Sequence, residues 1–424
     1  MTKKKPLPKE KGDLESLMSG ILDTVKDKSR SPFFSLGELQ EEKGVNYYIP
    51  SGMPNMDLFL HHDNDSVDAL FRYGLATGRM AEIFGPSRSF KTYLCHMFSS
   101  QCLKMGGLVF YLSVEKDIDI SFNKKVYEDN GVSLEEFGDN FAGTVVDTIS
   151  DLKAQFKLII EGVRSVRERT ESKFPVLIVL DSYAMMFGDE ELKNYSEAID
   201  ASITSVDSAK ATVVANNHLF KNKEALDFYR YANKEIGKLD ICFLFTNHIR
   251  SNVIKSKNRF GPAKLPVNND TLEYFSDTRL SVERAYVDKI SKDGKTIIGT
   301  ELLVTVAKMR GKVINRGKFR LFYRHDHGFD YLTSLLEAMI LSGLILVTDE
   351  EGRKIRFTDD IKEYDSLKPL LDCLVGKQVS MNKNDFRKHF IKCIREDIDF
   401  LSVVIDIVYE RGPTTTTDDR EVCW

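Results

Sequence analysis

One segment of the sequence combines residue types suited to holding phosphate: Gly85-Pro86-Ser87-Arg88-Ser89-Phe90-Lys91-Thr92. The apolar run GRMAEIF leads into it, and a helical pattern with Leu94, Met97 and Phe98 on one face follows. Backbone N–H groups of such a loop can cradle phosphate oxygens, a lysine can reach the terminal phosphates, and a threonine hydroxyl can ligate Mg²⁺. The segment therefore predicts a phosphate-binding loop (P-loop) whose ligands are ATP and Mg²⁺.

The loop departs from the general pattern at one position, because Phe90 stands where glycine usually precedes the lysine. A degenerate loop that no longer binds ATP is the alternative. Two carboxylates favour a working site: Asp181 ends the apolar run VLIVLD, and Glu115 follows the run LVFYLSV. At the carboxyl edge of a parallel sheet, Asp181 would hold the Mg²⁺ shell and Glu115 would orient or deprotonate the attacking water. A turn or cap role for Asp181 and a helix-start role for Glu115 are the alternatives.

The elements that must position these residues read as an α/β fold with a mainly parallel central sheet. From Gly78 to about Tyr323, short apolar runs alternate with helical patterns. Strands are predicted at 108–113, 176–181, 241–247, 280–283, 302–307 and 319–324. The first three are continuously apolar, as strands covered on both faces should be.

The two ends of the chain differ from this core. Residues 13–29 place Leu14, Leu17, Ile21 and Val25 at helical spacing behind a Lys/Pro-rich start. After Asp330 a helical pattern, LTSLLEAMILSG, precedes two extended runs that flank a turn in LILVTDEEGRKIRF. We expect a basic tail with a detachable helix at 1–44, the ATPase core at 45–330, a small α+β domain at 331–411, and a mobile tail at 412–424.

Composition narrows the class of protein. A chain of 424 residues with 42% hydrophobic residues is globular, and no apolar run approaches the ~20 residues of a membrane span. We expect a cytoplasmic protein with its six scattered cysteines reduced. A net charge of -4 means that any contact with DNA phosphates must come from a local basic patch.

Taken in order, the motifs resemble the RecA-family DNA strand-exchange recombinases. GPSRSFKT is similar to the P-loop of the UvsX-like recombinases of T-even phages, which also carry Phe before the Lys. The resemblance continues through IPSGMPNMDLFL, FYLSVEKDIDISF, VLDS, FTNHIR and VAKMRGKVINRGKFRLFYR, and covers roughly residues 45–345. It implies a RecA-type ATPase core, with the helix at 13–29 as an assembly helix packed on the next subunit of a filament. It also implies the cytoplasm of a bacterial host as the compartment if a phage encodes the chain.

The resemblance also assigns roles around the nucleotide. Lys91 and Thr92 match the phosphate and Mg²⁺ residues, Asp181 the Mg²⁺-shell carboxylate, and Glu115 the catalytic glutamate. Phe122 matches the aromatic that stacks on adenine, with Asp119 beside it among the nucleotide-binding residues; a core aromatic is the alternative for Phe122. His248 matches a polar sensor near the γ-phosphate, although a lone histidine after an apolar strand is also a common structural residue.

Two basic residues match the cations that a neighbouring protomer extends to the phosphates in family filaments. These are Lys308 and Arg310, and such cations would neutralise charge on the transferred phosphoryl group. Exposed basic residues at a strand end are the alternative. A further cluster, His325-Asp326-His327, could suggest a metal site, but a polar turn before Gly328 is the preferred interpretation.

DNA contacts are assigned to two loops. The second loop would span 251 to about 270, with phosphate-binding or base-stacking candidates Arg250, Lys255, Lys257, Arg259, Phe260 and Lys264. The first loop would fall near 206–222, with Lys221, Lys223 and Arg230 as candidates. Where RecA has paired glycines near the end of the second loop, this chain has Asn268-Asn269. Ordinary solvated surface is the alternative for both clusters.

The function implied is an ATP-dependent recombinase that forms a filament on single-stranded DNA and exchanges strands with a homologous duplex. Mediator and single-strand-binding proteins are the further partners expected. Two other functions use the same residues: a ring-forming RecA-core motor such as a replicative helicase, and a recombination mediator that binds nucleotide without hydrolysing it.

Overall fold

The computed structural model describes residues 45–62, 67–114, 120–170, 174–189, 191–193, 210–251, 264–285, 289–290, 297–310, 317–349, 354–359, 363–372, 381–397 and 399–413. The chain divides into two compact units, Met1–Val45 and Asn46–Trp424, and the described elements belong to the second. The helix expected at 13–29 lies outside the described residues, as does most of the tail expected at 412–424.

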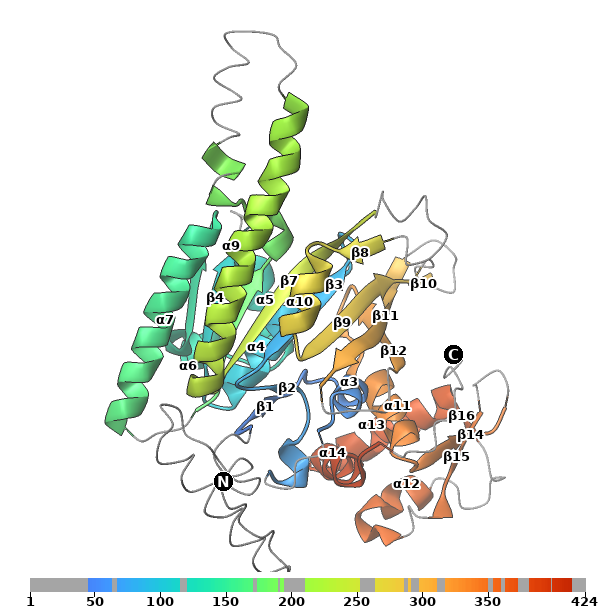
Figure 1. Cartoon of the computed structure of the whole chain (residues 1–424). Helices are drawn as coiled ribbons and strands as arrows, with labels where there is room; N and C mark the ends of the chain where they lie inside the picture. The colour runs from blue at the N-terminus through green and yellow to red at the C-terminus, as the bar shows by residue number, and fades with distance from the viewer. Residues whose placement is uncertain are drawn as a thin grey trace, which may run out of the picture. The chain divides into compact units, whose positions relative to one another are not determined.

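A large mixed sheet organises the second unit (Figure 1). Among the described residues its strand order is β13-β12-β11-β9-β3-β7-β6-β4-β5. The parallel part consists of β9 (Thr278–Arg284), β3 (Met80–Gly85), β7 (Ile241–Ser251), β6 (Val176–Asp181), β4 (Leu108–Ser113) and β5 (Phe141–Val145). The antiparallel part consists of β11 (Ile297–Met309), β12 (Lys318–Arg324) and β13 (Gly328–Phe329), while β10 (Lys289–Ile290) pairs with β11 and β8 (Lys264–Pro266) with β7. The prediction of an α/β fold with a mainly parallel sheet is confirmed.

Helices cover both faces of the parallel strands. On one face α4 (Lys91–Lys104) and α5 (Ile120–Asp129) share a core with residues such as Leu177 and Val179 of β6. On the other face α7 (Ile149–Thr170), α9 (Lys210–Leu239) and α10 (Asn269–Phe275) share a core with the alternating residues Ile178 and Leu180 (Figure 1). Because both faces of β6 are buried, its residues from Val176 to Leu180 are all apolar.

The strands follow the predicted ranges closely, with differences at their ends. β4 and β6 have the predicted bounds. β7 continues past residue 247 to Ser251, because its last residues pair with β8. β11 is longer than predicted, since β9 and β12 flank it on both sides. β5 was not predicted, because its residues FAGTV are largely exposed at the edge of the sheet and lack an apolar run.

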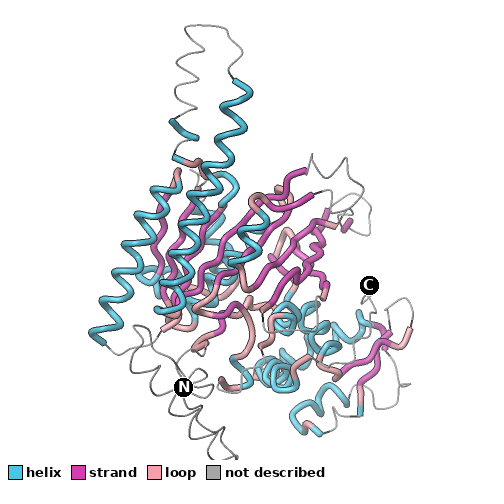
Figure 2. Tube along the Cα trace, in the orientation of Figure 1, coloured by secondary structure: helices cyan, strands magenta, loops and turns pink. Residues whose placement is uncertain are grey.

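Smaller elements surround the sheet (Figure 2). β1 (Tyr48–Ile49) pairs with β2 (Leu75–Ala76), and short helices occur at α3 (Pro54–Phe59), α6 (Leu134–Phe137), η1 (Ala69–Phe71), η2 (Gly138–Asn140) and η3 (Tyr183–Met185). After β13 come α11 (Tyr331–Leu341), β14 (Ile345–Val347), β15 (Lys354–Phe357), η5 (Asp365–Leu367), α12 (Lys368–Asp372), β16 (Met381–Asn382), α13 (Lys383–Glu396) and α14 (Phe400–Arg411). The predicted helix and the two extended runs after Asp330 are confirmed as α11, β14 and β15, with β16 as a third antiparallel strand. Among the described residues no helix has the length and apolar character to cross a membrane.

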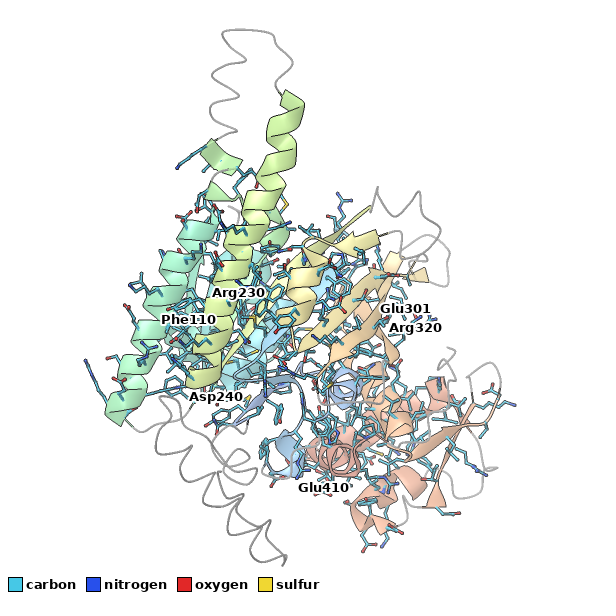
Figure 3. The ribbon with its side chains drawn as sticks, viewed as in Figure 1. Phe110, Arg230, Asp240, Glu301, Arg320 and Glu410 are labelled. Carbon is cyan, nitrogen blue, oxygen red and sulfur yellow. The ribbon has the colours of Figure 1, made fainter. Side chains whose placement is uncertain are left out.

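A buried polar cluster joins α3, β12 and α11. Asn55 donates from Nδ2 to the Arg320 carbonyl oxygen at 3.0 Å and to Glu337 Oε2 at 2.5 Å, and it is also hydrogen-bonded to Ser334. The Arg320 side chain forms an ion pair with Glu301, in which Nη1 lies 2.7 Å from Oε1, and the two residues are labelled side by side in Figure 3. Burial raises the pKa of Glu337 to about 8, so this carboxyl holds a proton in the folded chain near neutral pH.

The variant Glu337→Gln tests this assignment. The unfolded chain releases the Glu337 proton near the ordinary glutamate value of 4.5, whereas the folded chain keeps it up to about pH 8. The folded state therefore binds more protons in this window, and the free energy of unfolding falls as pH rises through it. Glutamine cannot ionise, so the stability of Glu337→Gln relative to the wild type should increase from pH 5 to pH 7.5 in urea titrations. A relative stability that is constant with pH, as expected for the exposed control Glu363→Gln, would contradict a proton-holding Glu337.

Candidate nucleotide-binding site

The predicted P-loop joins the end of β3 to the start of α4. β3 lies between β7 and β9, and Gly85 is the register partner of His248 on β7. A Cβ atom at Gly85 would lie 2.1 Å from the Val282 carbonyl oxygen of β9, so no other residue fits there without moving the sheet. The loop thus begins at a fixed point on the carboxyl edge of the parallel strands.

Lys91 begins α4, and its side chain folds back over the loop. Its ammonium donates to the carbonyl oxygens of Pro86 at 2.7 Å and Gly85 at 3.2 Å, and Ser89 Oγ donates to the same Pro86 oxygen at 2.9 Å. Lys91 is 6% exposed, whereas the next residue, Thr92, is exposed. The loop therefore surrounds a positive charge at the N-terminus of a 14-residue helix, which is a favourable place for an anion.

Phe90 adopts the backbone conformation that glycine supplies in the general motif. Its φ of 64° and ψ of 20° lie in the left-handed region, which costs a side-chain-bearing residue roughly 1–2 kcal/mol. The ring packs against Tyr323 of β12 at a centroid distance of 4.7 Å, with Tyr93 and Phe329 at 6.4 and 6.3 Å. Aromatic pairs contribute about 0.5–1.5 kcal/mol each beyond burial, enough to offset the backbone cost.

Asp181 lies at the end of β6, beside the loop. Its Oδ2 accepts a hydrogen bond from the Tyr111 hydroxyl of β4 at 2.9 Å, and its Oδ1 accepts one from the Thr246 hydroxyl of β7. Only 9% of the residue is exposed, and that part faces the cleft formed by the loop. The carboxylate is therefore fixed from the strands on both sides of its own.

His248 follows Asn247 on β7, and Asn247 fixes the backbone there. The Asn247 amide donates to Glu82 Oε1 at 2.9 Å and to the Val267 carbonyl oxygen at 2.8 Å, while its Oδ1 accepts the N–H of His248 at 2.9 Å. In the other direction, the Val267 N–H donates to the His248 carbonyl at 3.1 Å. The position of His248 at the cleft thus depends on one buried amide.

These residues line one cleft of about 430 Å³. The sequence patterns placed eight of its residues at the site: Ser87, Arg88, Ser89, Phe90, Lys91, Thr92, Asp181 and His248. Four others were not assigned to it: Tyr93, Arg284, Thr300 and His325. Arg284 is the last residue of β9. Its position at the carboxyl edge of the parallel strands, where the phosphate loop also lies, is the sequence signal that could have assigned it to the cleft. His325 belongs to a polar turn in which Asp326 accepts two hydrogen bonds from Arg324, and the described residues contain no group of three or more His, Cys, Asp or Glu side chains that could hold a metal ion.

Two buried charges that the patterns did not single out lie beneath the loop. Glu82 of β3 and Arg279 of β9 are paired at 2.5 Å with 0% and 5% of their side chains exposed. Arg279 also reaches Asn269 at 2.9 Å and Glu273 at 3.2 Å, and its guanidinium lies 4.9 Å from the centroid of the Phe84 ring. Burial raises the pKa of Glu82, and the Arg279 charge opposes that shift.

Lys308 and Arg310 do not line this chain's own cleft. The Lys308 ammonium donates to the Glu273 carbonyl, and Arg310 donates to Asp277 at 3.0 Å with 71% of its side chain exposed. Burial lowers the pKa of Lys308. Both cations therefore end β11 on the same surface as α10, bound to groups of their own chain.

Several predicted nucleotide and DNA residues lie outside the described residues or lack a described side chain. Six of them lie outside the described residues: Glu115, Asp119, Lys255, Lys257, Arg259 and Phe260. Phe122 lies in α5, Arg250 in β7 and Lys264 in β8, where only the backbone is described. The ends of the second predicted loop are ordered: Arg250 pairs with Leu265 and Ser251 with Lys264. Asn268 adopts the left-handed conformation, with φ of 54°, and its Nδ2 donates to the Tyr183 hydroxyl at 3.1 Å, so asparagine meets the demand that glycine would meet.

The first predicted loop, 206–222, is wrong for residues 210–222, which are helical. They begin α9, which continues through Leu239. A helix is favoured because residues 210–222 lack glycine and proline and repeat apolar residues at helical spacing. Lys221 lies within this helix, Lys223 is exposed on it, and Arg230, also exposed, lies 3.7 Å from Asp227 (Figure 3). These basic residues therefore belong to a helix and not to a loop.

A comparison of Phe90→Ala with Phe90→Gly tests the balance between strain and packing in the loop. Both variants lose the aromatic contacts, but alanine keeps the left-handed backbone cost that glycine removes. Phe90→Ala should therefore be less stable than Phe90→Gly by about 1 kcal/mol in urea unfolding. A Gly variant that is equal to or less stable than the Ala variant would show that the left-handed conformation imposes no strain.

No family model matches the chain. Curated relatives do: it is 24% identical to Protein RecA 1 of Myxococcus xanthus over 334 residues, or 78% of this chain and 82% of the relative. It is 24% identical to Protein RecA of Bdellovibrio bacteriovorus over 64% of this chain and 61% of the relative, and 22% identical to Protein RecA of Campylobacter lari over 69% and 70%.

The first of these matches covers 78% of this chain, and the mixed, mostly parallel sheet is consistent with a RecA-type core. The identities of 22–24% make the relationship a distant one. The chain is a distant homologue of the bacterial RecA proteins.

Proposed function

We propose that this chain is an ATP-dependent DNA recombinase of the UvsX-like kind, which assembles on single-stranded DNA and exchanges strands with a homologous duplex. The observation that carries the proposal is the convergence of Lys91, Thr92, Asp181 and His248 on one cleft at the carboxyl edge of a parallel sheet. The distant homology to RecA proteins and the phenylalanine before Lys91 support it. The expected compartment is the cytoplasm.

The residues of the cleft fit ATP and Mg²⁺. The Lys91 ammonium and the N-terminus of α4 provide positive charge for phosphate, while the Thr92 hydroxyl and the Asp181 carboxylate are oxygen donors of the kind Mg²⁺ prefers. When bound, Mg²⁺ would neutralise charge on the phosphates. In this proposal Glu115 orients the attacking water, while Asp119 and the Phe122 ring hold the base.

His248 would report the state of the nucleotide to the DNA-binding segment. Its backbone is hydrogen-bonded to Asn247 and Val267, so it stands between the cleft and the β7–β8 hairpin that begins the second predicted loop. Arg250 and Lys264, on this hairpin, and the predicted loop residues 255, 257, 259 and 260 would then contact DNA. Lys223 and Arg230, both exposed on α9, offer a second basic surface, and Lys221 lies in the same helix.

Steady-state ATP hydrolysis with and without single-stranded DNA at fixed low salt tests the proposal. We expect turnover that DNA stimulates and that Lys91→Ala abolishes, because the loop loses the charge that reaches the phosphates. Glu115→Gln should still bind nucleotide but lose turnover by at least about 10²-fold, the usual effect of removing a general base.

The matched control is Lys104→Ala, which removes an exposed lysine from the other end of α4. Absence of both turnover and DNA binding in the wild type would contradict a recombinase and favour a nonhydrolysing mediator. Closed rings instead of filaments in electron micrographs of the ATP-bound complex would favour a ring motor.

A mixing experiment tests whether Lys308 and Arg310 act on the neighbouring protomer. Since neither lines its own cleft, Arg310→Ala should bind nucleotide normally as a dilute chain but lose DNA-stimulated turnover on the order of 10³-fold, the effect of a missing trans-acting arginine. Mixing it with Lys91→Ala should restore part of the activity, because one chain supplies the loop and the other the cation. Lys318→Ala, an exposed basic residue on β12, is the control. No recovery on mixing would contradict action in trans.

A further inference from the structure

The Asp181 carboxylate is held by two hydroxyl groups that come from the strands on either side. β6 lies between β4 and β7, and these strands supply Tyr111 and Thr246. Each hydroxyl bonds a different carboxylate oxygen, so rotation of the carboxylate about its Cβ–Cγ bond would break both hydrogen bonds. Such charge-assisted hydrogen bonds are the stronger kind.

Tyr111 is itself held in place by a buried aromatic group. The His96 ring of α4 stacks on the Tyr111 ring at 4.7 Å with an interplanar angle of 4°, and His96 Nδ1 lies 3.2 Å from the Tyr127 hydroxyl of α5. His96 is on the helix that begins with Lys91, so the same helix carries the phosphate lysine and the support for Tyr111. The Tyr111 hydroxyl therefore cannot move without disturbing α4 and α5.

This arrangement constrains what Asp181 can offer to the cleft. With one lone pair on each oxygen used by Tyr111 and Thr246, the remaining lone pairs are the ones available to a cation or its water shell. Groups that orient the ligands of a metal change its affinity by about 10–100-fold when they are removed.

We propose that Tyr111 and Thr246 are positioning residues that set the orientation of Asp181 toward the cation of a bound nucleotide. The inference rests on the proposed nucleotide function and adds to it two residues outside the P-loop. Neither Tyr111 nor Thr246 lines the cleft; each acts through Asp181.

The test is the gain in ATP affinity that Mg²⁺ produces, measured by calorimetric titration of ATP in Mg²⁺ and in EDTA. Tyr111→Phe should raise the Mg²⁺ concentration needed for half of this gain by about tenfold, with ATP affinity in EDTA unchanged. Thr246→Val should shift it in the same direction, whereas Thr246→Ser, which keeps the hydroxyl, should restore the wild-type value. The serine and valine pair keeps the proposal testable if Tyr111→Phe does not fold.

The matched control is Tyr127→Phe, which removes a hydroxyl from the same buried group without touching Asp181. If Tyr111→Phe and Thr246→Val respond to Mg²⁺ as this control does, while the wild type shows a clear gain, the positioning role is overturned and the proposed function stands. If ATP binding by the wild type is indifferent to Mg²⁺, both are overturned. A shift in the two hydroxyl-lacking variants alone supports the proposal.

Discussion

The buried ion pair between Glu82 and Arg279 is the constraint on which the nucleotide site depends. Two ions removed from water are stable only when their remaining hydrogen-bonding groups are also satisfied. Here Asn247 donates to Glu82, while Asn269 and Glu273 accept from Arg279. The hydrogen bonds that satisfy the Glu82–Arg279 pair therefore fix β3, β7, β9 and the start of α10 against each other.

That constraint reaches the cleft through the backbone. Glu82 lies three residues before Gly85, Asn247 immediately precedes His248, and Arg279 is the second residue of the strand that ends at Arg284. A change in any member of the network would shift the loop, the sensor strand and the basic end of the cleft together. Removal of one partner of a buried ion pair lowers the free energy of unfolding by about 3–5 kcal/mol, which is far more than an exposed ion pair contributes to stability.

Much of the fold and part of the site could be predicted from the sequence because their signals are local. The strand-loop-helix context of Lys91 and Thr92, and Asp181 at the end of an apolar run, are contained in short segments. The Glu82–Arg279 pair could not be found in this way, because its members lie 197 positions apart and nothing in the local pattern of either strand links one to the other. Tyr111 and Thr246 look like ordinary strand residues until β4 and β7 are placed beside β6. The loop predicted near 206–222 rests on the family resemblance alone, so it misses the helical residues 210–222 at the start of α9.

Phe90 shows that the glycine of a loop motif can mark a required left-handed backbone torsion angle, which another residue can also adopt. In this chain the angle is maintained by a ring whose partners, Tyr323 and Phe329, belong to an antiparallel hairpin more than 200 residues away in the sequence. The segment 85–92 therefore depends on the rest of this fold and could not be transferred alone to another protein. Transplanted into another sheet without that hairpin, it would carry the strained backbone and lose the contacts that offset it, so in this protein the phosphate loop and the far edge of the sheet must change together.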